Sequence, residues 1–488
     1  MRIHGDVFIG GSWRTPATGQ VIDVVSPATE ELIGQVPDGA PADVDAAVAA
    51  ARLAFDHGEW PRLSPAERAA ALSRLSAAVK RRSEEFADLI SAQVGSPRAW
   101  ATIGQVGVAT AVLDTYTRLA ETHPWESDRR GAFGTTVRVR QLPVGVVAAI
   151  VPWNAPLFVA ALKLGPALAA GCTVVLKPSP EAPLDAYLLA EAVLEAGLPD
   201  GVVNIVPAGA AASEHLVRHP GVDKVSFTGS TAVGRRIGAL CGADVRRCTL
   251  ELGGKSAAIL LDDVDLDRRL LDGLVTGSMA NNGQICVSQT RILAPRARYA
   301  DVVDALAARV GELTVGDPAD PATEVGPLVS RRARESVLGH LAAAVADGAR
   351  PVTGGGRPAD QPRGWYIEPT VFAGVDNGMR IAREEVFGPV AVVIPYDDED
   401  DAVAIANDSE YGLAGSVWTG DPERGVAVAG RVRTGSVSVN SAAPLDLGSP
   451  FGGFKLSGIG REGGPEAFSA YTELQSVIMP RPRTTTTA

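Results

Sequence analysis

Residues 144–228 consist of short apolar runs separated by longer helical segments, and this alternation constrains the fold more than any other feature. The runs "VGVVAAIVPW", "CTVVLKPS", "GVVNIVPA" and "DKVSFTGS" have the composition of buried strands, and helices are expected near 157–169 and 184–197. Strands that alternate with helices predict βαβ units, and therefore a parallel sheet covered by helices on both faces. Ligands bind such sheets at the carboxyl ends of the strands, where this chain carries "PWNAP", "KPSPEAP" and "FTGST".

Helical patterns precede these strands, and a second α/β block follows them. Residues 41–122 are predicted to be helical, and "SPAERAAALSRL" within them opens with a capping box made by Ser64 and Glu67. Residues 128–145 alternate between polar and apolar side chains, which is typical of an exposed antiparallel excursion. A second α/β block is expected from "KSAAILLDD" at 255–263 to about residue 456.

Charge and cysteine content exclude several classes of partner. The chain carries 45 basic and 57 acidic residues, a formal net charge of −12, which predicts no nucleic-acid partner because such binding needs a positive surface. The four cysteines show no C-x-x-C spacing, so we expect no metal site and no disulfide framework, and a reducing compartment. No signal-peptide pattern is present, and Lys163, Pro166 and Gly171 interrupt the most apolar window, 158–177. We therefore expect a cytoplasmic protein without a membrane span.

One of the cysteines, Cys286, lies in "NNGQICVSQTR". A free cysteine is most often a small buried hydrophobe, and a nucleophilic cysteine needs a lowered pKa or a nearby base. No histidine lies near this stretch, so a base must come from elsewhere. Glu251 in the apolar stretch "RCTLELGGKS" is a candidate, because burial raises the pKa of a carboxyl toward neutrality. Asn154 in "VPWNAP" could donate to an oxyanion, although asparagine in a turn commonly serves its own backbone.

Two strand ends carry patterns that suit a phosphate or a ribose. In "FTGSTAVGR", Gly229 permits a tight turn and Ser230 opens a helix, whose N-terminus suits a phosphate. Lys177 and Ser179 follow another strand, although a solvated lysine and an ordinary strand–turn–helix junction explain the same patterns. The stretch "GIGREG" matches G-x-G-x-x-G, but it follows no strand and lies in no βαβ unit, so it is not read as a dinucleotide fingerprint.

Taken together and in this order, the motifs resemble those of the NAD(P)-dependent aldehyde dehydrogenase superfamily over nearly the whole chain. The matching stretches are "PWNAP", "LKPSPEAP", "FTGSTAVG", "ELGGKS", "GQICVSQTRI", "EEVFGPV", "NDSEYGLAGSVWT" and "PFGGFKLSGIGRE". The resemblance implies an α/β fold with a Rossmann-like NAD(P)-binding domain, an α/β catalytic domain and a small β oligomerisation element. The NAD(P)-binding domain is expected to comprise 1–122 and 144–253, and the catalytic domain 254–456. The oligomerisation element is expected to comprise 123–143 and 467–482. A homodimer or homotetramer is implied.

The resemblance also implies the role of individual residues. Cys286 is the expected nucleophile, Glu251 the base and Asn154 the oxyanion donor, and Lys163 and Glu462 match positions used in proton relay. The expected cofactor-binding residues are Ile150, Val151, Pro152, Trp153, Lys177, Ser179, Pro180, Gly209, Gly229, Ser230, Val233, Leu252, Gly253, Glu385 and Phe387. The expected substrate-binding residues, which are small, aliphatic or aromatic, are Ala155, Val159, Leu162, Ile285, Val287, Leu445 and Phe451.

These roles combine into the oxidation of an aldehyde to a carboxylic acid. The Cys286 thiolate attacks the carbonyl, the adduct expels hydride to a nicotinamide, and water activated by Glu251 hydrolyses the resulting thioester. Because no arginine stands among the substrate positions to hold a carboxylate, a medium or large apolar aldehyde is expected. One departure concerns the cofactor: many NAD-preferring members carry Glu where this chain has Pro180, and Glu181 comes one residue late. NAD is expected, with NADP possible.

Three other functions compete with this interpretation. Relatives that transfer the acyl group to coenzyme A lack the base in the "ELGG" motif, whereas Glu251 is present here and predicts hydrolysis. A cofactor-independent thiol esterase would pair its cysteine with histidine, and none of the six histidines lies in a matched motif. A non-catalytic binding protein would require loss of the nucleophile or the base, and both are present.

Overall fold

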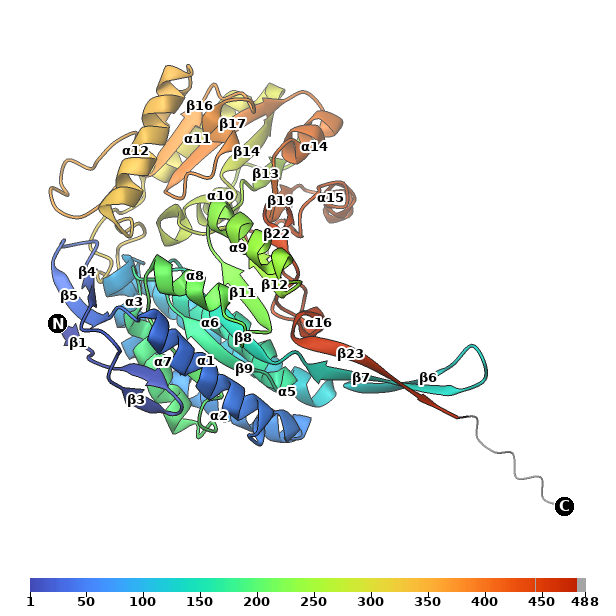
Figure 1. Cartoon of the computed structure of the whole chain (residues 1–488). Coiled ribbons are helices and arrows are strands. Elements are labelled where there is room, and N and C mark those ends of the chain that lie inside the picture. The colour runs from blue at the N-terminus through green and yellow to red at the C-terminus, as the bar shows by residue number, and fades with distance from the viewer. Residues whose placement is uncertain (444, 481–488) are drawn as a thin grey trace.

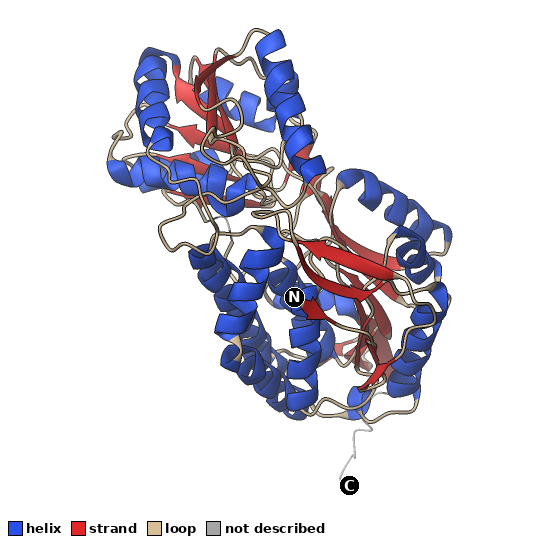
Figure 2. Cartoon of the chain, turned by 90° about the vertical axis from the view of Figure 1, so that its left-hand side faces the viewer, coloured by secondary structure: helices blue, strands red, loops and turns tan. Residues whose placement is uncertain are grey.

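The computed structural model describes residues 1–443 and 445–480, which form two α/β lobes and a thin projecting arm (Figure 1). Each lobe is built on one sheet with helices against it, and the strands form two separate groups in the perpendicular view (Figure 2). Within the described ranges, none of the helices combines the length and the apolar content that crossing a bilayer requires.

The first lobe contains an eight-stranded sheet with the order β22-β12-β11-β8-β9-β10-β2-β3. Its central strands are parallel, as predicted: β8 (Val146–Ile150), β9 (Thr173–Lys177), β10 (Val203–Ile205), β11 (Lys224–Thr228) and β12 (Arg247–Glu251). Antiparallel edges are added by β2 (Val7–Ile9) with β3 (Ser12–Arg14), and by β22 (Gly458–Ile459).

Helices cover both faces of this sheet, which is why its strands read as continuous apolar runs. Val147 and Ala149 of β8 pack on one face with helices α2 (Pro65–Arg81), α3 (Ser83–Val94), α5 (Val108–Thr122), α6 (Pro156–Ala170) and α7 (Leu184–Glu195). Val146 and Ala148 pack on the opposite face with α1 (Pro41–Asp56), α8 (Ala210–Arg218) and α9 (Thr231–Ala243). The predicted capping box opens α2, because the backbone N–H of Ser64 donates to Glu67 Oε2 over 2.7 Å.

The second lobe contains a seven-stranded sheet with the order β15-β16-β17-β14-β13-β19-β20. The strands are β13 (Ala257–Leu260), β14 (Arg291–Pro295), β15 (Arg350–Thr353), β16 (Thr370–Ala373), β17 (Val390–Tyr396), β19 (Ala414–Trp418) and β20 (Ser436–Val439). One face is covered by α10 (Arg268–Met279) and α11 (Tyr299–Gly311). The other face is covered by α12 (Arg331–Ala346), α13 (Arg380–Arg383), α14 (Glu399–Asn407) and α15 (Pro422–Ala429).

The C-terminal part of the chain leaves the second lobe and returns to the first (Figure 1). The edge strand β22 carries Gly458 from the "GIGREG" stretch and pairs with Leu250 and Glu251 of β12. A Cβ atom on Gly458 would collide with the Leu250 carbonyl, so this glycine permits the close pairing of β22 with β12. The chain then passes through α16 (Phe468–Tyr471) into β23 (Thr472–Met479).

The arm is the expected antiparallel excursion. It is a three-stranded sheet in which β7 (Thr136–Pro143) pairs with β6 (Glu126–Arg130) on one side and with β23 on the other. Of the range 467–482 expected for this element, residues 481 and 482 lie outside the described residues.

The remaining elements are short. They are β1 (Arg2–Ile3), β4 (Val21–Val25), β5 (Leu32–Pro37), β18 (Tyr411–Gly412), β21 (Phe454–Lys455), α4 (Arg98–Trp100), the π-helix η2 (Ala101–Gly107), and the 3₁₀ turns η1 (Trp60–Arg62), η3 (Ala280–Gly283), η4 (Arg296–Arg298) and η5 (Pro465–Ala467).

Candidate active site

The two lobes meet where the turn after β8 contacts the loop after α10. The side-chain amide of Asn154, in the "PWNAP" turn, donates to the backbone carbonyl of Gln284 over 2.9 Å. The same loop carries Cys286 two residues later. Before it, Asn281 and Asn282 both have left-handed backbone conformations, with φ of 51° and 62°, which asparagine tolerates better than most residues. The predicted oxyanion donor and the predicted nucleophile are therefore brought together by two turns.

Cys286 is half-buried, and its thiol is neutral in the protein alone. Burial raises its pKa to about 12, and the negative charges of Glu385 and Glu251 contribute in the same direction. The backbone at Cys286 is closely packed, because a Cβ atom on Gly254 would lie 2.5 Å from the Cys286 carbonyl oxygen. The thiol thus lies between the turn that follows β12 and the segment that carries Glu385.

Glu251 ends β12 and is 3% exposed. Neither of its carboxyl oxygens has a hydrogen-bond partner among the described residues. Burial raises the pKa of this carboxyl well above its ordinary value, and the negative charge of Glu462 raises it further. The segment that carries Gly452 can pack closely against Glu251 because glycine has no side chain, since a Cβ atom there would lie 2.7 Å from Glu251 Oε1. The carboxyl that was predicted to be a base therefore has both oxygens available for a proton.

A buried ion pair lies behind Glu251. Lys163 of α6 and Glu462 of the returning chain are 0% and 1% exposed, and Lys163 Nζ lies 2.7 Å from Glu462 Oε1. Ser226 Oγ accepts from Lys163 Nζ over 3.1 Å, and the Tyr471 hydroxyl donates to Ser226 Oγ over 3.3 Å. Lys163 and Glu462 lie in stretches that resemble the family's motifs, whereas Ser226 and Tyr471, which complete the network, carry no motif that predicts this contact.

The carboxyl ends of β9 and β11 carry the predicted phosphate and ribose positions. Ser230 is the N-cap residue of α9, and no side chain in the described part of the chain caps this helix. Lys177 is 6% exposed, and burial lowers its pKa to about 8 against the charges of Glu181 and Asp38. Glu181 accepts a hydrogen bond from Ser179 Oγ and lies 3.8 Å from Arg332 Nη2. A free helix N-terminus suits a phosphate, and the Lys177 ammonium at the end of β9 suits a ribose or a phosphate.

Glu385 and Phe387 form the wall opposite β12. The Gly254 backbone N–H donates to Glu385 Oε1 over 3.2 Å, and burial raises the pKa of this carboxyl to about 7. A Cβ atom on Gly253 would collide with Glu385, so glycine is needed for this approach. Phe387 has a left-handed backbone, with φ of 57°, and its ring meets that of Trp153 edge-on at 5.5 Å. Strained backbone of this kind concentrates at ligand sites.

A small pocket borders this wall, and its lining includes Ile285, Glu385 and Phe387. The remaining residues predicted to bind cofactor are dispersed along the strand ends. Ile150, Val151 and Leu252 are buried, Pro152 and Pro180 are half-buried, Val233 is 46% exposed on α9, and the backbone N–H of Gly209 donates to Asp38 Oδ1 over 2.8 Å.

The predicted substrate positions fall into two groups. Ile285 and Val287 are half-buried on either side of Cys286, Ala155 is the N-cap residue of α6, and Leu445 is half-buried. Val159, Leu162 and Phe451 are almost fully buried, at 7%, 2% and 8% exposure. Phe451 bridges Glu462 through paired backbone hydrogen bonds. The sequence neighbours of Cys286 are thus apolar, whereas the charges that act on its thiol are the carboxyls of Glu385 and Glu251.

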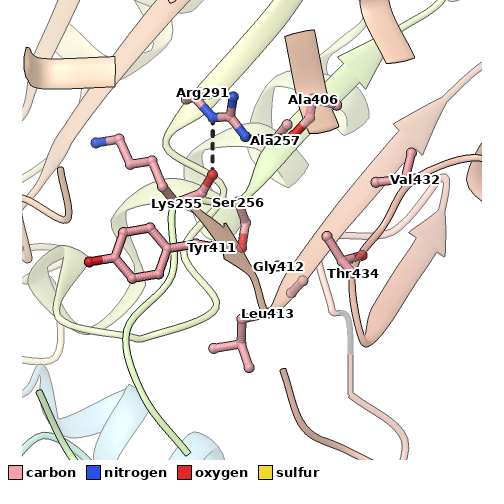
Figure 3. Close-up of a pocket in the computed structure, with 11 residues that line it drawn as sticks. Lys255, Ser256, Ala257, Arg291, Ala406, Tyr411, Gly412, Leu413, Val432 and Thr434 are labelled. Atoms are coloured by element: carbon pink, nitrogen blue, oxygen red, sulfur yellow. Dashed lines mark hydrogen bonds between the residues drawn. The ribbon is translucent and has the colours of Figure 1, made fainter. Parts of the chain in front are cut away.

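Some residues that shape the site were not singled out from the sequence. Arg291, 2% exposed, donates from Nε to the Lys255 carbonyl over 3.0 Å (Figure 3). It also donates to two other carbonyls of the second lobe, those of Ile405 and Ala406. It thereby anchors the turn that follows Glu251. Gln105 of the π-helix donates to the Asn154 carbonyl over 2.9 Å. Arg291 belongs to the motif "GQICVSQTRI", which gives its side chain no evident role, and Gln105 lies in a helical pattern without any motif.

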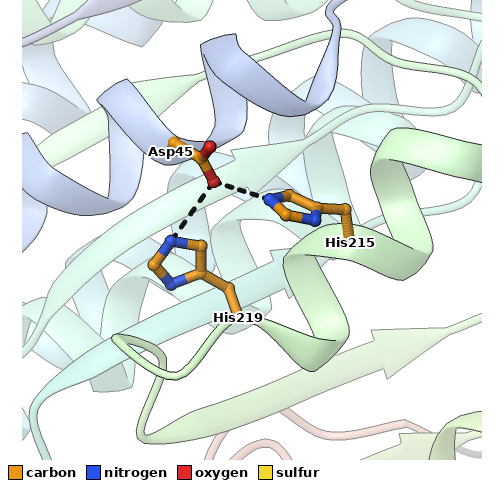
Figure 4. A group of neighbouring side chains, drawn as sticks. All are labelled: Asp45, His215 and His219. Carbon is orange, nitrogen blue, oxygen red and sulfur yellow. Dashed lines mark hydrogen bonds and ion pairs between the residues drawn. The ribbon is translucent and has the colours of Figure 1, made fainter.

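A cluster away from this site resembles a metal site. Asp45 of α1 lies 2.6 Å from His215 Nε2 and 3.4 Å from His219 Nε2, both from the end of α8 (Figure 4). The Gly221 N–H donates to His219 Nδ1 over 3.0 Å, so Nδ1 is the acceptor and the proton of the neutral ring is on Nε2. A metal would need the lone pair of that same nitrogen. The group is therefore a hydrogen-bonded cluster.

Comparison with known proteins gives one consistent result. A sequence model described as "Aldehyde dehydrogenase family" matches residues 13–477. Geranial dehydrogenase of Castellaniella defragrans is 50% identical over 476 residues, which cover 98% of this chain and 99% of the relative.

Solved structures agree with this match. A Mycobacterium tuberculosis aldehyde dehydrogenase complexed with NAD+ superposes with a TM-score of 0.97 at 49% identity, covering 99% of both chains. A mutant of aldehyde dehydrogenase C from Pseudomonas syringae, in complex with NAD+ and octanal, gives 0.93 at 40% identity, covering 97% of this chain and 96% of the other. This chain belongs to the aldehyde dehydrogenase family.

Proposed function

We propose that this aldehyde dehydrogenase oxidises a medium or large apolar aldehyde to the carboxylic acid with NAD+, using Cys286 as nucleophile and Glu251 as general base. The observation that carries the proposal is the half-buried Cys286 thiol whose pKa responds to a buried, unpaired Glu251 carboxyl. The apolar side chains of Ile285 and Val287 beside the thiol support the substrate class. Relatives named for geranial and crystallised with octanal support it as well.

The chain has the residues that hold a dinucleotide. The uncapped N-terminus of α9 and Lys177 would hold its pyrophosphate and ribose, and Glu385 would accept hydrogen bonds from the second ribose. Gly253, which has no side chain, and Phe387, with its left-handed backbone, border the narrow space proposed for the flat nicotinamide ring. When bound, the oxidised nicotinamide supplies a hydride acceptor and a positive charge.

In the acylation half-reaction, the half-buried Cys286 thiol gives its proton to solvent water, and the resulting thiolate sulfur attacks the aldehyde carbon. Asn154 Nδ2 has two hydrogens, of which one bonds to the Gln284 carbonyl and the other is available to the oxyanion. Removing such a donor typically slows catalysis by about 10²–10³-fold. Loss of hydride from the substrate carbon then leaves a thioester on Cys286.

In the hydrolytic half-reaction, Glu251 accepts a proton from water, which attacks the thioester and releases the acid. Its raised pKa suits this role, because a carboxylate with a higher pKa is a stronger base toward water. We assign Glu462 and Lys163 to the removal of that proton, since Glu462 acts electrostatically on Glu251 and contacts Lys163 over 2.7 Å. Hydrolysis rather than transfer to coenzyme A follows from the presence of this base.

NAD+ is proposed over NADP+ on the position of Glu181. Although Pro180 occupies the place where many NAD-preferring members carry Glu, the Glu181 carboxylate is held by Ser179 and lies near Lys177. A carboxylate there accepts hydrogen bonds from ribose hydroxyls and repels a 2′-phosphate. NADP+ use is the alternative, because Arg332 Nη2 lies 3.8 Å from Glu181 Oε1 and could pair with the 2′-phosphate of NADP+. The Arg332 side chain is 91% exposed and so is open to such a ligand.

The four free cysteines support a cytoplasmic location, because disulfides are rare in that reducing compartment.

The arm supports assembly of the chain into a homo-oligomer, either a dimer or a tetramer. Leu474 and Ile478 of β23 are each 70% exposed, and every residue of β6 is exposed. A three-stranded sheet with so little packing needs a partner surface to be stable. A second copy of this chain is the proposed partner.

A panel of aldehydes with NAD+ and NADP+, followed by nicotinamide absorbance on the wild type and on Cys286→Ala, tests the reaction. We expect activity on apolar aldehydes that vanishes in the variant. A kcat/KM preference for a charged or very small aldehyde would contradict the substrate class. Acyl-CoA formation with added coenzyme A would contradict hydrolysis, and ester hydrolysis without aldehyde oxidation would favour the thiol esterase.

A further inference from the structure

The backbone carbonyl of Asn154 accepts two hydrogen bonds from two buried side-chain amides. Gln105 Nε2 donates to it over 2.9 Å from η2, and Asn281 Nδ2 donates over 2.9 Å from the loop that leads to Cys286. The side chain of Asn154 is held as well, because its Nδ2 donates to the Gln284 carbonyl. Three separate segments therefore determine where the amide of Asn154 lies.

Gln105 has a polar side chain at a fully buried position, where an apolar residue would be expected if the side chain served only for packing. It is 0% exposed, and its Oε1 has no hydrogen-bond partner in the described part of the chain. The amide orientation is determined by the Asn154 carbonyl, since only Nε2 can donate to it. An unpaired buried amide oxygen costs stability, whereas an apolar side chain of the same length does not. Stability alone therefore does not explain a glutamine here.

The helix that carries Gln105 is a π-helix, in which the Val108 N–H bonds to the Ile103 carbonyl five residues earlier. Such a turn adds a residue to the helix and rotates the side chains that follow, and π-turns are frequent at functional sites. Here the wider turn lies against α6, whose N-cap residue Ala155 directly follows Asn154. The irregular turn thus brings a polar side chain to the base of the predicted oxyanion donor.

We propose that Gln105 is a positioning residue that holds Asn154 so that its free Nδ2 hydrogen points to the oxyanion. This inference rests on the proposed role of Asn154. Gln105 does not itself touch the substrate, and it acts only through the backbone of Asn154. It leaves the resting protein slightly less stable and sets the donor in place before the reaction, which is where such donors are effective.

The test replaces Gln105 with methionine, which has a similar length and no amide. We expect kcat/KM for an apolar aldehyde to fall about tenfold, less than the fall of about 10²–10³-fold expected for Asn154→Ala. The KM should change little, because the interaction is made mainly as the oxyanion forms. The melting temperature should change little or rise, because Asn281 still donates to the Asn154 carbonyl and the unpaired oxygen is removed.

A double variant separates positioning from a general structural effect. In the Asn154→Ala background nothing remains to be positioned, so adding Gln105→Met should change kcat/KM by less than about twofold. The matched control is Gln93→Met, since Gln93 is also 0% exposed but pairs with Asp185 Oδ1 and the Leu184 N–H away from this site. We expect the control to lower the melting temperature and to leave kcat/KM of the folded enzyme unchanged.

Each outcome decides the matter. Wild-type kcat/KM in Gln105→Met would overturn the proposal, and so would a full tenfold loss in the Asn154→Ala background. A Gln105→Met chain that fails to fold would also overturn it, because the amide would then be structural. If Asn154→Ala itself retains full activity, the proposed oxyanion role fails, whereas loss in Asn154→Ala with none in Gln105→Met refutes the present inference alone.

Discussion

Glu251→Gln should make the apoprotein more stable than the wild type at neutral pH, although it removes the proposed base. The carboxyl is 3% exposed and unpaired among the described residues, and burial raises its pKa well above the ordinary value of 4.5. Between pH 4.5 and its native pKa, the folded wild type holds a proton that the unfolded chain has released. The free energy of unfolding therefore falls as pH rises through this window.

The size of the effect follows from one proton. Each pH unit inside the window lowers the unfolding free energy of the wild type by about 1.4 kcal/mol relative to Glu251→Gln, whose amide does not titrate. A chain of 488 residues unfolds with an entropy of about 1 kcal/mol/K. The melting temperature of the wild type should thus fall by about 1.4 °C per pH unit relative to the variant.

The assay is thermal unfolding of both apoproteins in half-unit steps from pH 5 to 7. Glu195→Gln is the control, because hydrogen bonds from Arg82 and Arg81 lower the pKa of that carboxyl, so it is ionised in both the folded and the unfolded chain above pH 4.5. The melting temperature of this variant should therefore keep a constant offset from that of the wild type between pH 5 and 7. If the melting temperatures of the wild type and Glu251→Gln change with pH by the same amount, the raised pKa of Glu251 is refuted. With NAD+ and aldehyde, Glu251→Gln should still form one equivalent of NADH rapidly and then stall at the thioester.

Three further changes test other parts of the structure. Lys163→Met should destabilise the protein by about 3–5 kcal/mol, because it leaves the buried Glu462 carboxylate unpaired, and adding Glu462→Gln should restore most of the loss in thermal unfolding. Alkylation of Cys286 by iodoacetamide, followed by peptide mass spectrometry, should be slow below pH 9, because the pKa of the thiol is about 12. The reaction should accelerate when NAD+ is added. Equal alkylation rates with and without NAD+ would contradict the assignment of a neutral thiol that the cofactor activates. Leu474→Glu on the arm should lower the mass measured by light scattering, whereas Val345→Glu, 54% exposed on α12, should not.

Much of the fold could be predicted from the sequence because local patterns record local burial. The apolar runs at 146–150 and 173–177 are strands with both faces covered, and the capping box at Ser64 begins a helix as expected. Motif resemblance then pointed to Cys286, Glu251 and Asn154. The structure brings Asn154 to the loop of Cys286 through the Gln284 carbonyl, and the pKa of Cys286 responds to the charge of Glu251.

The rest depends on contacts between distant segments, which no local pattern contains. Gln105 reads as one more polar residue in a helical stretch, and only the folded chain places its amide against the Asn154 carbonyl. The link from Glu462 through Ser226 to Tyr471 likewise arises because the chain returns from the second lobe to the first. The pKa values are also tertiary properties, since burial is their largest cause.

The directions of these shifts indicate how the site is regulated by its own cofactor. Burial raises the pKa of both Cys286 and Glu251, so the protein alone holds a neutral thiol beside a carboxyl that resists ionisation. Beside a buried carboxyl and a half-buried thiol, a single positive charge acts more strongly than it would in bulk water. A cation next to Cys286 would favour the thiolate, whereas Asn154 is already in place without it. The fold therefore sets the geometry in advance and leaves activation of the nucleophile to the arrival of charge.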